Sequence, residues 1–226
     1  MPAPKLFATS LLLGLLTCPT PTDAQVTSPI ASSQLQNLAQ LKDEIRAYYA
    51  NGSYDREVSD IESDATRYVD QRVAAGVKAP AVVLDIDDTA LSTTGYELDH
   101  DFAYDRASWN AYAASPGFPA IGATLAFAKH VQSEGVSVFF VTGRRVPETS
   151  VTIENLKAAG YAYAHLYLRP VDERAASVVP FKSGERAQIE QAGYTVLETI
   201  GDQWSDLEGG HAERAYKLPN PMYFIP

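Results

Sequence analysis

The sequence predicts an α/β fold, a Rossmann-like doubly wound parallel sheet preceded by helices. Short, continuous apolar runs, typical of strands covered on both faces, occur at residues 81–84, 136–141, 166–168 and 196–200. Helical periodicity separates these runs, at residues 121–134, 148–159 and 183–192. Strands that alternate with helices in this way are usually joined as parallel βαβ units.

Two amphipathic helices are predicted before the first strand. Residues 34–50 carry apolar side chains at three- and four-residue spacing, and Asn51 and Gly52 end the pattern. A second pattern of the same kind runs to about Ala75, and Gly76 ends it. We therefore expect one domain over residues 34–226, which opens with a helical pair.

Composition limits the possible partners of the chain. Of its 226 residues 46% are apolar, which favours a globular fold, and the formal net charge is −10. An acidic surface disfavours a nucleic acid polymer as a partner, because phosphate backbones need a basic stripe. A small phosphorylated substrate needs only a local positive pocket and is still allowed.

The first residues resemble an export signal. Lys5 precedes an apolar run over residues 6–16, and small side chains at Thr22 and Ala24 favour cleavage after Ala24. Residues 1–24 are thus expected to be a signal peptide, followed by a flexible leader over residues 25–33. No segment is long and apolar enough to predict a transmembrane helix. We expect a periplasmic or secreted protein.

Cys18 is the only cysteine and raises an alternative, a lipid anchor. The site fits this poorly, since Thr17 is bulkier than the small residue expected before a lipidated cysteine and Pro19 follows it. Cleavage after Ala24 would leave no thiol for a disulfide or a thiolate metal site.

Polar side chains follow several predicted strands at the point where each ends. Asp85 follows the first run, Thr142 the second and Asp202 the last. Ligands bind at these carboxyl ends in doubly wound sheets. Asp85 and Asp87 would share a face of the chain, and two close carboxylates need a cation or a proton between them. The pair predicts either a Mg²⁺ site or a shared-proton acid/base pair, with a simple polar loop as the alternative.

Other residues at the same edge suit an anion. Thr142 and Gly143 stand where a strand turns, so that backbone N–H groups and a hydroxyl can meet a phosphate. Lys182 opens a later helix, and Asp206 lies four residues after Asp202. Carboxylates, a hydroxyl and a lysine together match the needs of phosphoryl transfer.

These segments resemble the haloacid dehalogenase (HAD) superfamily over about residues 40–226. The matching motifs are Asp85-Ile86-Asp87-Asp88-Thr89, Phe140-Val141-Thr142-Gly143-Arg144, Lys182 and Gly201-Asp202-Gln203-Trp204-Ser205-Asp206. Within the superfamily the chain is similar to the acid phosphatase branch, subfamily IIIB, with its plant vegetative storage proteins and bacterial class B and class C enzymes. The resemblance implies a HAD-like domain.

The resemblance also implies roles. Asp85 would attack phosphorus and form an aspartyl phosphate, while Asp87 would protonate the leaving alcohol and then activate water. The Asp85 carboxylate, the Asp87 backbone carbonyl and Asp202 would hold Mg²⁺, and Asp206 would orient Asp202 or a water molecule on the metal. The phosphoryl oxygens would be bound by Thr142, Gly143 and Lys182.

An aromatic-rich segment follows the first strand, where this superfamily inserts its cap. We define residues 92–121 as the cap segment. Tyr96, Tyr104 and Trp109 are candidates for the substrate entrance, where they would stack on a nucleobase or aryl group. The alternative is that these rings only pack the cap onto the domain.

Taken together, the sequence predicts a Mg²⁺-dependent acid phosphatase acting on small phosphomonoesters. A phosphotransferase or a 5′-nucleotidase could use the same site. A storage or binding protein of the same fold is an alternative of another class, which the presence of Asp85 and Asp87 disfavours.

Overall fold

The computed structural model describes residues 1–2, 36–115, 117–171 and 177–225. Apart from its first two residues, the expected signal peptide lies outside the described residues, as do Cys18 and the leader at 25–33. From Asn37 onward the chain forms one compact unit.

A five-stranded parallel sheet confirms the predicted α/β class. Its spatial order is β3-β2-β1-β4-β5. The strands are β1 (Pro80–Leu84), β2 (Ser137–Arg145), β3 (His165–Arg169), β4 (Thr195–Gly201) and β5 (Arg214–Lys217). The β5 strand was not predicted, because it lies at the sheet edge and has no apolar run. The central position of β1 puts Asp85 in the middle of the carboxyl edge.

Helices connect and cover the strands. The two expected N-terminal helices are α1 (Leu38–Ala50) and α2 (Ser53–Ala74), and the expected crossover helices are α5 (Gly122–Ser133), α6 (Thr149–Ala159) and α7 (Val179–Gln191). Short 3-10 turns, η1 (Val146–Glu148) and η2 (Trp204–Asp206), follow β2 and β4. Because α7 begins at Val179, Lys182 lies in its first turn.

Within the described residues, none of the helices is both long enough and apolar enough to cross a membrane.

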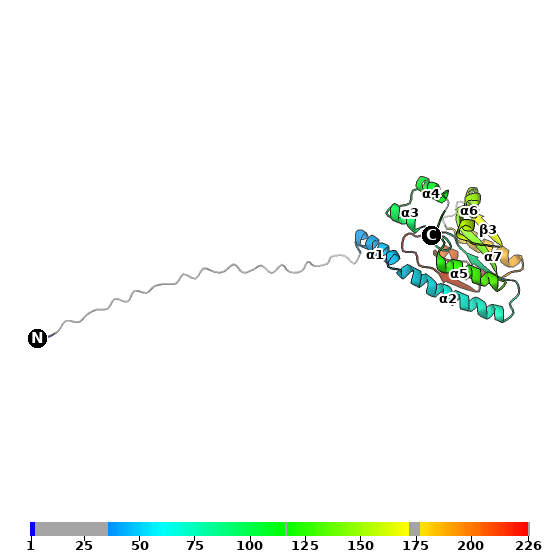
Figure 1. Cartoon of the computed structure of the whole chain (residues 1–226), viewed down its shortest axis with the longest axis horizontal. Helices are drawn as coiled ribbons and strands as arrows, with labels where there is room; N and C mark the ends of the chain where they lie inside the picture. Colours follow the sequence, from blue (N-terminus) through cyan, green and yellow to red (C-terminus); the bar gives the residue numbers. More distant parts are fainter. Residues whose placement is uncertain (3–35, 116, 172–176, 226) are drawn as a thin grey trace. The chain divides into compact units, whose positions relative to one another are not determined.

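Alternate residues of the central strand bury opposite faces of the sheet. Val82 and Leu84 belong to the larger core, which includes side chains of α2, α5 and α6. Ala81 and Val83 belong to a second core, which α7 covers. The helices therefore form layers on both faces of the sheet, with α2 and α5 together on one of them (Figure 1).

The cap segment leaves the domain after β1 and returns before α5. Its base is closed by backbone hydrogen bonds, from Ser92 N to the Pro119 carbonyl and from Ile121 N to the Ala90 carbonyl, both 2.9 Å. It contains two short helices, α3 (Thr94–Asp99) and α4 (Arg106–Ala113). Neither was predicted, because each is too short to show a helical period.

Candidate active site

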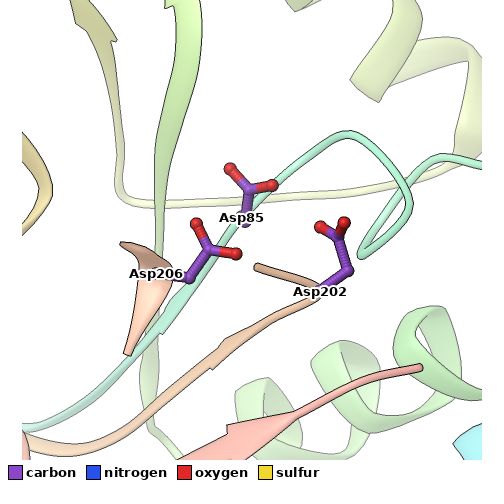
Figure 2. A group of neighbouring side chains, drawn as sticks. All are labelled: Asp85, Asp202 and Asp206. Carbon is purple, nitrogen blue, oxygen red and sulfur yellow. The ribbon is translucent and has the colours of Figure 1, made fainter. Parts of the chain in front are cut away.

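Three buried carboxylates meet at the carboxyl edge of the sheet. Asp85 follows β1, Asp202 follows β4, and Asp206 ends the η2 turn (Figure 2). One carboxylate oxygen of each lies within 4.8 Å of the others. All three residues are buried, with at most 7% of their surface exposed. The fold thus brings together Asp85 and the Asp202–Asp206 pair, which lie more than a hundred residues apart in sequence.

Burial and mutual repulsion make these carboxylates hard to ionise together. Burial raises the pKa of Asp85 well above its ordinary value, and the charges of Asp206 and Asp202 raise it further. Burial and the charge of Asp206 raise the pKa of Asp202 to about 6. The trio therefore favours either a proton or a cation at its centre.

Lys182 supplies one positive charge to the trio. Its Nζ donates to Asp85 Oδ1 at 2.8 Å and also to Asp206 Oδ1. Burial alone would lower the pKa of Lys182, but the neighbouring charges of Asp206 and Asp85 raise it above its ordinary value. One ammonium faces three carboxylates, which leaves negative charge to be compensated.

The donor set fits a divalent cation with hard ligands. Carboxylate oxygens are the ligands that Mg²⁺ and Ca²⁺ prefer, and closely spaced buried acids are otherwise costly. The backbone also makes room for the third acid. A Cβ at Gly201 would overlap the Asp206 side chain, so glycine at the end of β4 lets Asp206 approach.

Asp202 is oriented by donors that the sequence analysis did not identify. Thr89 Oγ1 donates to its Oδ1 at 3.0 Å, and its Oδ2 accepts from Gln203 Nε2 at 2.6 Å and from Asn220 Nδ2 at 2.7 Å. Thr89 and Gln203 stand inside the quoted motifs and could have been noticed there. Asn220 reaches the site from the C-terminal segment and has no local signal.

Asp87 is not part of this group of three, and it pairs with Arg144. Arg144 donates from Nη2 to Asp87 Oδ1 at 2.6 Å and from Nε to Oδ2 at 3.0 Å. The guanidinium carbon lies 4.9 Å from the centre of the Phe118 ring, which the cap segment contributes. Arg144 is not among the site residues predicted from the sequence. Its planar fork holds the Asp87 carboxylate in one orientation.

The predicted phosphate-binding residues Thr142 and Gly143 lie inside the last part of β2, not after it as predicted, because the strand continues past its apolar run to Arg145 with a register irregularity after Thr142. Thr142 is 1% exposed, and its Oγ1 accepts a hydrogen bond from Arg144 N at 3.1 Å. Gly143 is exposed. Because β2 pairs with β1 in parallel, both lie on the same edge of the sheet as Asp85.

A cavity of about 390 Å³ opens beside this edge, between the cap segment and the domain. Asp87, Gly143 and Arg144 line its inner side. Tyr104 and Trp109 line it from the cap segment. Tyr96 does not. It has no exposed surface, and its hydroxyl donates to the Asp105 carbonyl at 3.1 Å, so it packs the cap.

A further buried acid ties three segments together. Asp88 is 1% exposed and adopts a left-handed backbone conformation, with φ of 53°. Its carboxylate accepts from Thr93 N at 2.8 Å, from the Thr93 hydroxyl and from the Tyr223 hydroxyl at 2.8 Å. Asp88 thereby fixes the loop after β1 to the start of the cap segment and to the C-terminal segment.

Comparison with known proteins gives concordant matches. The family model of the HAD superfamily, subfamily IIIB (acid phosphatase), matches residues 15–226. Acid phosphatase 1 of Solanum lycopersicum is 32% identical over 188 residues, which cover 81% of this chain and 74% of that protein. Vegetative storage protein 1 of Arabidopsis thaliana is 32% identical over 149 residues, 64% of this chain and 55% of that one.

A solved structure shares the fold. The class C acid phosphatase from Bacillus anthracis superposes with a TM-score of 0.69, over 83% of this chain and 86% of that one. The two sequences are 19% identical in this alignment, so the likeness concerns the fold alone.

Proposed function

Because this chain belongs to subfamily IIIB of the HAD superfamily and is a phosphatase of that family, we propose that it hydrolyses small phosphomonoesters with Mg²⁺ through an aspartyl phosphate on Asp85. One observation carries the proposal. Asp85 directly follows the central strand, is held by Lys182 at 2.8 Å, and lies beside buried acids that a cation would neutralise.

The first step is an in-line displacement at phosphorus. A carboxylate oxygen of Asp85 forms the new P–O bond while the bond to the leaving alcohol breaks. Asp87 gives its proton to the departing oxygen. Lys182 keeps the Asp85 carboxylate in one orientation, and Arg144 does the same for Asp87.

The second step returns the enzyme to its starting state. Asp87 takes a proton from a water molecule, whose oxygen attacks phosphorus. The P–O bond to Asp85 breaks, inorganic phosphate leaves, and Asp87 again carries the proton. Thr142, Gly143 and Lys182 are proposed to bind the phosphoryl oxygens through both steps, because all three stand at the edge that holds Asp85.

Asp85, the Asp87 backbone carbonyl and Asp202 are proposed to hold Mg²⁺, with Asp206 orienting this set. When bound, the ion supplies charge neutralisation for the transferring phosphoryl group. The hydrogen bonds from Thr89, Gln203 and Asn220 would keep Asp202 ready for it.

Hydrolysis of p-nitrophenyl phosphate tests the proposal. The purified protein should turn over this ester with Mg²⁺, lose activity with EDTA, and be inactive as Asp85→Asn. Titration calorimetry measures Mg²⁺ binding independently of turnover. The Asp202→Asn variant should bind Mg²⁺ more weakly than the wild type. Turnover that persists in Asp85→Asn preparations freed of contaminating phosphatases would refute the nucleophile.

Two of the relatives are named vegetative storage proteins, which raises the alternative of storage without turnover. The association of Asp85 with Lys182, and of Asp87 with Arg144, favours catalysis instead. A phosphotransferase or a 5′-nucleotidase would use the same residues. New phosphoesters formed in the presence of glycerol would reveal phosphotransfer, and a nucleotide panel would reveal the nucleotidase.

We also propose that residues 1–24 export the chain to the periplasm or the medium. Lys5 and the apolar run at residues 6–16 support this. Mass determination of the mature protein would show the cleavage after Ala24, or a lipid at Cys18.

A further inference from the structure

Glu97 is a buried acid in the substrate cavity that the reaction does not use. It belongs to α3 of the cap segment, is 6% exposed, and lines the cavity together with Asp87. Among the described residues, no hydrogen bond or ion pair holds its carboxylate. This distinguishes it from Asp85, Asp88 and Asp202, each of which has donors.

Such a carboxylate is costly for a fold to retain. Burial raises the pKa of Glu97, and the nearby His100 only partly opposes this. His100 itself is engaged elsewhere, because its Nδ1 bonds to the Tyr96 carbonyl at 2.8 Å and its ring stacks on Tyr96. An unpaired acid that faces a cavity therefore has its partner in whatever enters that cavity.

The other lining side chains indicate the kind of partner. Tyr104, Trp109 and Tyr223 line the same cavity as Glu97, and so does Phe102, whose ring already meets the Arg46 guanidinium at 4.9 Å. The faces of such rings attract cations, most strongly where water is excluded. A carboxylate among aromatic rings is a chemistry suited to an ammonium group.

The arginines that line the cavity do not pair with the Glu97 carboxylate. Arg144 is committed to Asp87. Arg145 donates from Nη1 to the carbonyls of Pro170 and Val171, at 3.1 and 3.2 Å. Arg106 is exposed to solvent at the rim, where its charge is screened.

We propose that Glu97 is a specificity-determining residue, which binds an ammonium group on the leaving alcohol of a phosphomonoester. This inference rests on the proposed function: with the ester phosphate at Asp85, the leaving alcohol lies on the side of Asp87, which lines the same cavity as Glu97. A volume of about 390 Å³ is enough for an aromatic or aliphatic amino alcohol.

A pair of esters that differ only in the ammonium tests the proposal. O-phosphotyramine and 4-ethylphenyl phosphate share the leaving-group ring and the phosphate. The wild-type ratio of their kcat/KM values should favour O-phosphotyramine by about 10-fold or more, as expected for a charge-assisted hydrogen bond to a carboxylate that is only 6% exposed. In Glu97→Gln this ratio should fall close to one.

A second acid of the same cavity provides the matched control. Glu148 also lines the cavity, but its carboxylate accepts from Arg145 N at 2.7 Å. Glu148→Gln removes the same charge and should keep the ratio. Glu97→Gln is isosteric and removes an unpaired buried charge, so its melting temperature at neutral pH should equal or exceed that of the wild type.

The outcomes separate the two proposals. Wild type that turns over neither ester refutes the proposed function, and this inference with it. Turnover of both esters without a preference, or a preference that survives Glu97→Gln, overturns the inference alone. A further outcome is a Glu97-dependent difference in kcat/KM between adenosine monophosphate and inosine monophosphate, with none between the two esters. This result would mean that Glu97 binds the amino group of a base, and it would also overturn the ammonium assignment.

Discussion

Glu198→Gln should remove a large part of the pH dependence of this protein's stability. Glu198 lies in β4 with no exposed surface, and neither carboxylate oxygen has a hydrogen-bond partner among the residues the structure describes. Burial, and then the charge of Glu62 on α2, raise the pKa of Glu198 from 4.5 to about 9. Tyr216 and Arg214 of β5 lower the pKa of Glu198, but they only partly offset this increase.

The sign follows from proton binding in the two states. Between the unfolded pKa of 4.5 and the folded pKa of about 9, the folded state keeps a proton that the unfolded state has released. The free energy of unfolding therefore falls as pH rises through this window, by about 1.4 kcal/mol per pH unit for one group. From about pH 5 to about pH 8 the loss is at most about 4 kcal/mol.

The variant has no charge to bury at either pH. Glu198→Gln and wild type should unfold with similar free energies near pH 5, and the variant should be more stable by up to about 4 kcal/mol near pH 8. Urea unfolding followed by tryptophan fluorescence measures the free energy of unfolding of each protein at each pH. Taking the difference between the two proteins cancels the titrations of Asp85 and Asp202, which the variant does not touch.

Glu134→Gln is the matched control, because Glu134 is exposed at the end of α5. It should show the pH dependence of the wild type. The reasoning would be refuted if Glu198→Gln and wild type had parallel stability curves across this pH range, since the buried carboxylate would then not be the group that titrates.

Three further predictions concern the site. Lys182→Met leaves the carboxylate trio without its ammonium, so kcat on p-nitrophenyl phosphate should fall by about 100-fold or more. The free energy of unfolding of this variant, measured without metal, should be about 3 kcal/mol lower than that of the wild type. An unchanged kcat would show that Lys182 takes no part in the reaction. In Gly201→Ala the new Cβ would overlap the Asp206 side chain, so Mg²⁺ binding measured by calorimetry should be weaker by about 10-fold or more. An unaltered Mg²⁺ affinity would contradict the proposed orienting role of Asp206. Arg144→Lys replaces the two nitrogen donors to Asp87 with a single ammonium, so kcat should fall by about 10-fold while the Mg²⁺ affinity stays the same. Full activity would mean that Asp87 does not need Arg144 to hold its orientation.

The fold class and four of the five strands could be predicted from the sequence, because both depend on local patterns. The end of β2 was predicted wrongly, since the apolar run stops at residue 141 whereas the strand continues to Arg145. A run such as residues 81–84 must be covered on both faces, and helical periods between the runs leave few topologies other than parallel βαβ units. Parallel strands end at a common edge, so the predicted nearness of Asp85, Thr142 and Asp202 needed no coordinates.

Only the tertiary structure decided the partners of the side chains. Arg144 meets Asp87 across 57 positions of sequence, and Glu62 faces Glu198 because α2 packs on β4. Glu97 could be identified as unpaired only once the surrounding cavity was known. Periodicity reports how much of a residue is buried, whereas its partners depend on which distant segments the sheet and helices bring against it.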